Sequence, residues 1–308
     1  MAAATAEWSH AQAMGRAVPA RLLGKLQDCS ALLADPQRLR QHLAEEGHVY
    51  LHGVLDQAEV LAARQEVAER LVAVGELRVP AHDAIATGAS RRRELHPDLG
   101  VFWQSVSEGA SLRRVTHGAA LQRCATALLG TAARGQDYVF LRAGAQGRYT
   151  GAHCDYPFFT RMTEQVITFW IPLGPVPTSD GPLYILEGSH RFADWNDAVR
   201  GFDVARDASR KATFADSPIA LAEDRGCRLL SADFTAGDVV AFGMFTWHGA
   251  FDNRSPLNRV RLSCDVRYQP ADHALDPRYF GPHPTGTTGA GYGELNGAKP
   301  LTEPWHVR

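Results

Sequence analysis

Pairs of histidine and aspartate two positions apart are the first residues whose spacing suggests chemistry. The chain contains two such tripeptides, His-Cys-Asp at 153–155 and His-Pro-Asp at 96–98. Alternate residues of a β-strand point to the same face, so His153 and Asp155 could bind one metal ion together. The central proline of the other tripeptide cannot donate to a strand ladder. We therefore favour His153 and Asp155 over His96 and Asp98 as metal ligands.

A third ligand follows a later strand-like run. His248 comes after the segment 237–243 (GDVVAFG), which is typical of a turn followed by a strand. If strands of one sheet system bring His248 beside the pair, two imidazoles and one carboxylate lie on one side of a metal. That is the ligand set of non-haem Fe(II) oxygenases, in which the opposite positions stay open. A Zn²⁺ hydrolase with water in the fourth position is the alternative.

Arginines add a second kind of chemistry. After His248, the residues Arg259, Arg261 and Ser263 alternate with apolar residues, as in a strand with one polar face. A guanidinium is a planar donor that can bind a carboxylate through two hydrogen bonds. Arg259 is therefore the candidate for the far carboxylate of a dicarboxylate cosubstrate, a role that the zinc alternative leaves empty. Arg142, on a preceding strand, could reach the cosubstrate or an anionic substrate.

Helical signals dominate the first third of the chain. Residues 35–46 begin with Asp-Pro and end before a glycine. Residues 56–75 begin with an aspartate cap, and Glu59 follows three residues later. A third helix is predicted over 117–129, again closed by a glycine. Residues 76–116, rich in arginine and glycine, are predicted to be an irregular connection.

From about residue 136 the hydrophobic period changes to that of strands. Apolar or alternating runs predict strands at 137–143, 148–155, 165–173, 181–188, 227–233, 237–243 and 260–270, with one earlier strand at 48–55. This pattern favours a mainly β fold with flanking helices over alternating βαβ units. We expect one domain over 1–308, with a helical part at about 1–135, a β core at about 136–270 and a loop-rich tail at 271–308. Residues 191–225 form a polar, weakly helical insertion.

The composition excludes several classes of protein. The 308 residues carry a net charge of −2, so no overall basic field points to nucleic acid or anionic lipid. No apolar run of about 18 residues predicts a membrane span. Five scattered cysteines fit a reducing compartment, and we expect a cytoplasmic enzyme with a small-molecule substrate. The arginine run at 91–93 is predicted to be a solvated loop, with a subsite for an anionic substrate as the alternative.

Four segments, taken in order, carry a family resemblance. They are GRYTGAHCDYPFF, ITFWIPLG, GPLYILEGSHR and WHGAFDNRSPLNRVRLSCDVRY. Together they resemble the phytanoyl-CoA dioxygenase-like family of Fe(II)- and 2-oxoglutarate-dependent oxygenases, closely over about 136–270 and loosely over 35–74. The resemblance implies a double-stranded β-helix, a jelly roll of the cupin kind, in agreement with the strand pattern. It also implies Fe(II), 2-oxoglutarate and O₂ as participants in the reaction.

The resemblance also assigns roles to residues. It implies His153, Asp155 and His248 as the iron ligands and Arg259 as the residue that binds the distal carboxylate of 2-oxoglutarate. Thr168 could support Arg259 there, with a core hydroxyl as the alternative.

A non-catalytic jelly-roll binding protein that kept these ligands by descent is a third hypothesis for the whole chain.

Aromatic residues near the metal pair are candidates for a substrate pocket. Tyr156, Phe158 and Phe159 directly follow Asp155, and aromatic core is the alternative for all three. Trp170 shares a strand face that the resemblance places inward, either as a pocket wall or as packing.

The retained carboxylate predicts the reaction outcome. In halogenating relatives a small residue replaces the carboxylate and frees an iron position for the halide. Because Asp155 is present, we expect hydroxylation, with release of succinate and CO₂, and desaturation or ring closure are the alternatives.

Overall fold

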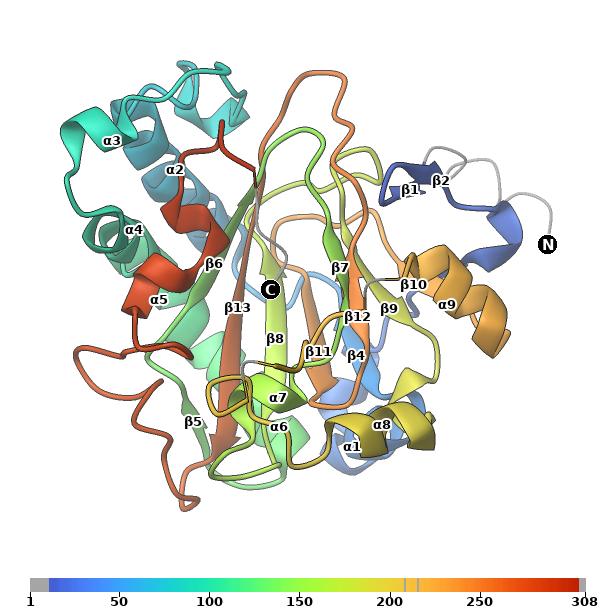
Figure 1. Ribbon diagram of the computed structural model, residues 1–308. Coiled ribbons are helices and arrows are strands. Elements are labelled where there is room, and N and C mark those ends of the chain that lie inside the picture. The colour runs from blue at the N-terminus through green and yellow to red at the C-terminus, as the bar shows by residue number, and fades with distance from the viewer. Residues whose placement is uncertain (1–10, 208, 215, 305–308) are drawn as a thin grey trace.

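Two β-sheets face each other in the computed structural model, which describes residues 11–207, 209–214 and 216–304 (Figure 1). The strands of the first sheet, in spatial order, are β3 (Leu23–Lys25), β10 (Leu229–Ser231), β9 (Leu183–Leu186), β12 (His248–Ala250) and β7 (Thr150–His153). The second sheet contains β4 (His48–Leu51), β11 (Val239–Gly243), β8 (Ile167–Pro172), β13 (Arg261–Pro270) and β5 (Ala133–Gly135), and β6 (Phe140–Gly144) also pairs with β13. A short ribbon of β1 (Gln12–Ala13) and β2 (Arg16–Ala17) lies apart. This architecture confirms the predicted mainly β jelly roll with flanking helices.

Helices cover one side of the sandwich. They are α1 (Pro36–Glu46), α2 (Gln57–Ala73), α3 (Arg92–Leu95), α4 (Leu99–Ser107), α5 (Ala110–His117) and α6 (Ala119–Leu129), and α8 (Ala193–Val199) and α9 (Pro218–Arg225) lie in the later insertion. No helix among the described residues is both long and apolar enough to cross a bilayer.

Local sequence signals explain the helix ends. Asp35 accepts a hydrogen bond from the Arg38 amide at the start of α1, and Gly47 ends that helix with a φ of 76°. Asp56 caps α2 in the same way, through the amide of Glu59. The helices predicted over 35–46, 56–75 and 117–129 are confirmed, with shifts of one or two residues at their ends. The prediction of an irregular segment at 76–116 is wrong, because this segment holds α3, α4 and α5.

The long strand β13 separates two environments. Its apolar residues Leu262, Cys264, Val266 and Tyr268 join the main hydrophobic core, which also includes buried residues of the helices. The alternate residues are polar and lie on the opposite face, between the two sheets. A second apolar cluster, which includes Trp170 and Phe234, fills part of that inner space.

The arginine run at 91–93 corrects another prediction. Arg92 is fully buried, forms an ion pair with Glu76 at 2.5 Å, and donates to the carbonyls of Ala298 and Lys299. Only its neighbours Arg91 and Arg93 are exposed, as expected of a solvated loop. In its described part, residues 271–304, the loop-rich tail contains 3-10 helices at Gly291–Glu294 and Asn296–Ala298, and Arg92 fastens it to the N-terminal part of the chain.

Candidate metal centre and its pocket

Antiparallel pairing of β7 with β12 places His153 directly opposite His248. Both imidazoles are buried, and their ring centroids lie 4.3 Å apart. One ligand atom from each of His153, Asp155 and His248 lies within 4.8 Å of the other two. The sequence predicted Asp155 on the same strand as His153, but β7 ends at His153. Asp155 lies just past the strand at the N-terminus of α7 (Tyr156–Phe159), with φ −84° and ψ −10°, and its carboxylate still reaches the two imidazoles.

Backbone carbonyls select the tautomer of both histidines. Nδ1 of His153 lies 3.0 Å from the carbonyl oxygen of Gly151, and Nδ1 of His248 lies 2.9 Å from that of Thr246. A carbonyl can only accept, so Nδ1 carries the proton in the neutral ring and Nε2 keeps its lone pair. Both imidazoles are therefore prepared as metal ligands, in the manner typical of ligating histidines.

Asp155 is oriented by two donors. Its Oδ2 accepts hydrogen bonds from Thr168 Oγ1 at 2.5 Å and from Arg267 Nη2 at 2.8 Å. Its Oδ1 lies 4.0 Å from Nε2 of His153, on the side of the imidazoles. The carboxylate thus presents one oxygen to the protein and the other to the metal position.

Electrostatics favour the ligand forms of these groups. The pKa of His153 is lowered to about 3. Burial is the largest cause, and the adjacent His248 acts in the same direction. Burial also lowers the pKa of His248. Burial raises the pKa of Asp155, but Arg267 and the two histidines outweigh it, so the net pKa is below its usual value. Two neutral imidazoles and one carboxylate fit a divalent iron ion, and each donor is already free of a competing proton.

A cavity opens beside His153 and Asp155. Of the predicted pocket residues, Phe158, Phe159 and Arg142 line it. The remaining lining residues are Phe140, Leu141, Tyr149, Thr150, Gly151, Thr213, Arg267, Thr287, Glu294, Leu295, Asn296 and Gly297. The last five come from the C-terminal tail, which the sequence had indicated only as loop.

Two predicted substrate residues lie elsewhere. The Tyr156 hydroxyl donates to Glu164, and its ring stacks on Phe245. Trp170 is 2% exposed and packs against Phe234 inside the sandwich. Neither residue is among those that line the cavity, and each packs against an aromatic neighbour.

Arg259 also lies away from the cavity. Its Nη1 forms an ion pair with Asp180 at 3.0 Å, and neither Arg259 nor Arg261 is among the residues that line the cavity. Thr168, predicted to support Arg259, instead donates to Asp155. The structure therefore does not bring Arg259 and Thr168 together.

Two further arginines belong to β13 itself. Arg261 and Arg267 share the inner face of the strand with Ser263 and Asp265, and Arg267 reaches Asp155. Arg267 was missed by the sequence reasoning. The signal was present, because polar residues recur at every second position from 261 to 269.

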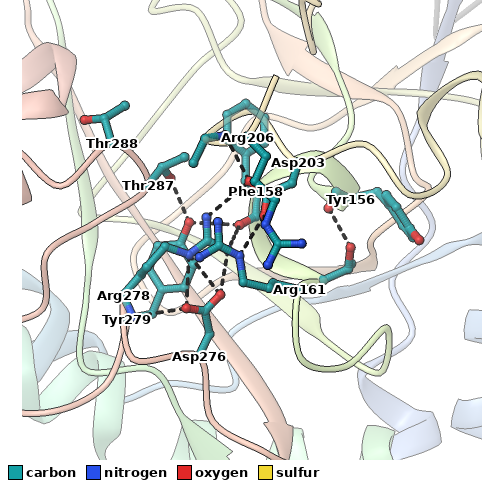
Figure 2. Close-up of polar contacts among 12 residues, drawn as sticks. Tyr156, Phe158, Arg161, Asp203, Arg206, Asp276, Arg278, Tyr279, Thr287 and Thr288 are labelled. Carbon is teal, nitrogen blue, oxygen red and sulfur yellow. Dashed lines mark hydrogen bonds and ion pairs between the residues drawn. The ribbon is translucent and has the colours of Figure 1, made fainter. Parts of the chain in front are cut away.

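The tail also holds the far end of α7 (Figure 2). Arg278 Nη2 and the Tyr279 hydroxyl both donate to the carbonyl oxygen of Phe158, at 3.2 and 2.9 Å. Arg278 is itself fixed by Asp276 and lies 3.6 Å from Asp203 of the insertion. These contacts anchor the helix that begins at the metal ligand.

The competing tripeptide at 96–98 has a structural role. Asp98 caps α4 by accepting from the amides of Gly100 and Val101, and the His96 ring packs on Phe102. Among the described residues, only His153, Asp155 and His248 form a group of at least three potential metal ligands.

Comparisons with known proteins agree with this site. A model of the phytanoyl-CoA dioxygenase (PhyH) family matches residues 43–260. The 1-deoxypentalenic acid 11-beta-hydroxylase of Streptomyces exfoliatus is 27% identical over 296 residues, which cover 87% of this chain and 93% of that protein. The enzyme of the same name from Streptomyces arenae is 26% identical over 267 residues, covering 79% of this chain and 84% of that protein.

Solved structures share the fold. The epimerase SnoN, in complex with Fe³⁺, alpha ketoglutarate and nogalamycin RO, aligns with a TM-score of 0.54 and 20% identity, over 87% of this chain and 93% of that chain. The non-heme alpha ketoglutarate dependent carbocyclase SnoK aligns with a TM-score of 0.52 and 21% identity, over 82% and 90% of the two chains. Since the family model matches well over half of the sequence, this chain belongs to the phytanoyl-CoA dioxygenase family and is an Fe(II)- and 2-oxoglutarate-dependent oxygenase.

Proposed function

We propose that this oxygenase hydroxylates a C–H bond of a small organic molecule held in the cavity beside His153 and Asp155. The observation that carries this proposal is the preorganised ligand set of two neutral imidazoles and one oriented carboxylate, which opens onto that cavity. When bound, iron and 2-oxoglutarate supply the oxidising chemistry, with release of succinate and CO₂.

The residues around the metal have separate tasks in this proposal. His153, Asp155 and His248 hold the iron, and the carbonyls behind the two histidines keep their Nε2 atoms unprotonated. Phe158 and Phe159 provide an apolar wall that excludes water and orients the substrate. The protein contributes position and shielding, while the bond-making steps belong to the metal and its cosubstrates.

For the far carboxylate of 2-oxoglutarate we propose Arg261 in place of Arg259. Arg261 is 4% exposed, and its Nη1 donates to the hydroxyl of Ser263 at 2.8 Å. Burial lowers its pKa to about 10, and nearby Arg142 acts in the same direction. Within the described part of the chain Arg261 forms no ion pair with a carboxylate, which leaves a buried cation that an incoming carboxylate would stabilise.

Arg142 completes this proposed subsite. It lies across from Ser263 on the neighbouring strand β6, and its Nε donates to Asp265 at 2.6 Å. Its terminal nitrogens form no hydrogen bond with another described residue, and the side chain lines the cavity. Two guanidinium groups and a hydroxyl therefore converge where one carboxylate would relieve their mutual repulsion.

The experiment combines metal analysis with a 2-oxoglutarate turnover assay. The purified protein should bind iron and release succinate from 2-oxoglutarate, whereas His153→Ala and His248→Ala should lose both properties. His96→Ala is the matched control and should keep both. Zinc binding without turnover would instead support a hydrolase. A protein that shows neither metal binding nor turnover would support a non-catalytic binding protein.

We further propose that residues 1–308 form one cytoplasmic catalytic unit. Support for one unit comes from the tail, which lines the cavity and is fastened by Arg92 to the N-terminal part. Support for a reducing compartment comes from the five cysteines, all of which are buried and free.

A further inference from the structure

Arg267 touches both the metal site and the wall of the cavity. Its side chain is 1% exposed, and Nη2 donates to Oδ2 of Asp155 at 2.8 Å. The same guanidinium lies over two rings of the cavity wall, 4.1 Å from the centroid of Phe159 and 4.5 Å from that of Phe140. Cation–π contacts of this kind are strongest when the cation is desolvated. One buried side chain therefore contacts a metal ligand and two substrate-facing rings.

The contact with Asp155 controls the orientation of the carboxylate. Thr168 donates to the same oxygen and also lies 3.3 Å from Nε of Arg267, so the three side chains form a closed triangle. Without these donors the carboxylate could rotate and turn its lone pairs away from the metal position. Partners that fix a metal ligand in this way commonly contribute strongly to metal affinity.

The contact with Phe159 is maintained from the other side. The Tyr279 and Phe159 rings pack against each other, with their centroids 4.9 Å apart. The Tyr279 hydroxyl donates to the backbone carbonyl of Phe158 (Figure 2). Arg278 reinforces the same carbonyl. The C-terminal tail thus holds the Phe159 ring against Arg267, and Arg267 in turn holds Asp155.

We propose that Arg267 is a positioning residue that couples the Phe159 side of the substrate pocket to the metal carboxylate. The proposal rests on the proposed function, because it requires a divalent metal at His153, Asp155 and His248. The coupling predicts an effect that would not occur if Arg267 only filled space in the core. A change to the pocket wall at Phe159 should weaken metal binding, although Phe159 is not a metal ligand.

The first test measures the affinity for Co²⁺ alone, by titration of the metal-free protein. Arg267→Met keeps most of the side-chain volume but removes both donors, and we expect a loss of affinity of about 10- to 100-fold. Arg267→Lys keeps the charge and should restore part of the loss. Arg64→Met is the matched control, since Arg64 is also buried but donates to the carbonyls of His82 and Leu173, away from the metal. Unchanged Co²⁺ affinity in Arg267→Met, or an equal loss in Arg64→Met, would overturn the proposal.

The second test compares two neighbouring phenylalanines and does not depend on the stability of the arginine variants. Both Phe158 and Phe159 line the cavity, but only Phe159 contacts the guanidinium of Arg267. Phe159→Leu should lower Co²⁺ affinity several-fold, whereas Phe158→Leu should leave it unchanged. In the double variant, Phe159→Leu should add little to Arg267→Met, because the connection is already broken. Equal effects of the two leucine variants, or full additivity, would contradict the coupling.

Failure of this inference differs from failure of the proposed function. If the parent protein binds no divalent metal, the proposed function itself is wrong. If the parent binds Co²⁺ and all Arg267 and Phe159 variants bind it equally well, only the positioning role is wrong.

Discussion

At the scale of single residues, the candidate metal ligands and the proposed carboxylate-binding arginine depend on different kinds of sequence signal. His153 and Asp155 are close in sequence, and the local chain alone keeps them near each other. The arginine depends on where β13 begins. The strand starts at Arg261, so Arg259 lies before it and pairs with Asp180, while Arg261 is the first residue on the inner face.

This difference predicts how two variants bind 2-oxoglutarate. Arg261→Met should raise the Kd for 2-oxoglutarate by at least ~30-fold, because removing one partner of a buried charge pair costs about 2–5 kcal/mol. Arg259→Met should change that Kd little. Titration of 2-oxoglutarate into each metal-loaded variant measures both effects. A larger effect at Arg259 would restore the assignment made from the sequence.

The lowered pKa values of the ligand histidines predict a pH dependence for the metal-free protein. In the unfolded chain His153 has a pKa near 6.5, whereas burial lowers its pKa to about 3 in the folded protein. Between these values the unfolded state binds more protons, so stability should fall as the pH is lowered through this window. The pKa of His248 is lowered in the same direction.

Urea unfolding of metal-free protein at pH 7 and pH 5 measures the effect. The loss of stability between these pH values should be smaller in a His153→Asn/His248→Asn variant than in the parent. An equal loss in both proteins would assign the pH dependence to other groups.

At the scale of elements, the longer predicted helices were found, and the short helices between residues 76 and 116 were missed. Segment 76–116 contains short helices of four to nine residues, interrupted by Pro97 and Gly109. Such helices are weak in isolation and depend on packing. The burial of Arg92 among the elements of this region could not be read from a run of three arginines.

Arg92 therefore gives a prediction about how the elements are held together. Arg92→Met should lower the free energy of unfolding by about 3–5 kcal/mol, because it leaves Glu76 buried without its partner. The adjacent exposed Arg91→Met is the matched control and should leave stability nearly unchanged. Denaturant unfolding of the three proteins provides the comparison. Adding Glu76→Gln to Arg92→Met should recover part of the loss, and no recovery would argue against the ion pair as its source.

At the scale of the whole molecule, the sandwich, the helices and the tail together define the reaction site. The sheets supply His153 and His248, Asp155 begins α7, whose phenylalanines line the cavity, and the tail lines it as well. The complete site retains the carboxylate of Asp155, and this predicts the reaction outcome. If His153, Asp155 and His248 hold the iron and the cosubstrate binds it through two atoms, one position would remain for oxygen and none for a halide.

Incubation with iron, 2-oxoglutarate, ¹⁸O₂, chloride and an accepted substrate tests this prediction. We expect ¹⁸O in an alcohol product, detected by mass spectrometry. A chlorinated compound as the main product would contradict it. Asp155→Gly is the informative companion variant, since it removes the carboxylate and opens a coordination position.

The sequence by itself determined the fold class, the capped helices and the three potential metal ligands. These features depend on short-range patterns, namely strand periodicity, helix caps and a His-x-Asp spacing within a recognisable order of segments. Tertiary structure alone decided that Arg261 and Arg267 lie on the inner face of β13, that Arg259 pairs with Asp180, and that the tail lines the cavity. The physical reason is that the start of a strand and the packing of a loop depend on distant partners. No local pattern specifies the pairing of Arg92 with Glu76 or the donors that Arg278 and Tyr279 supply to α7.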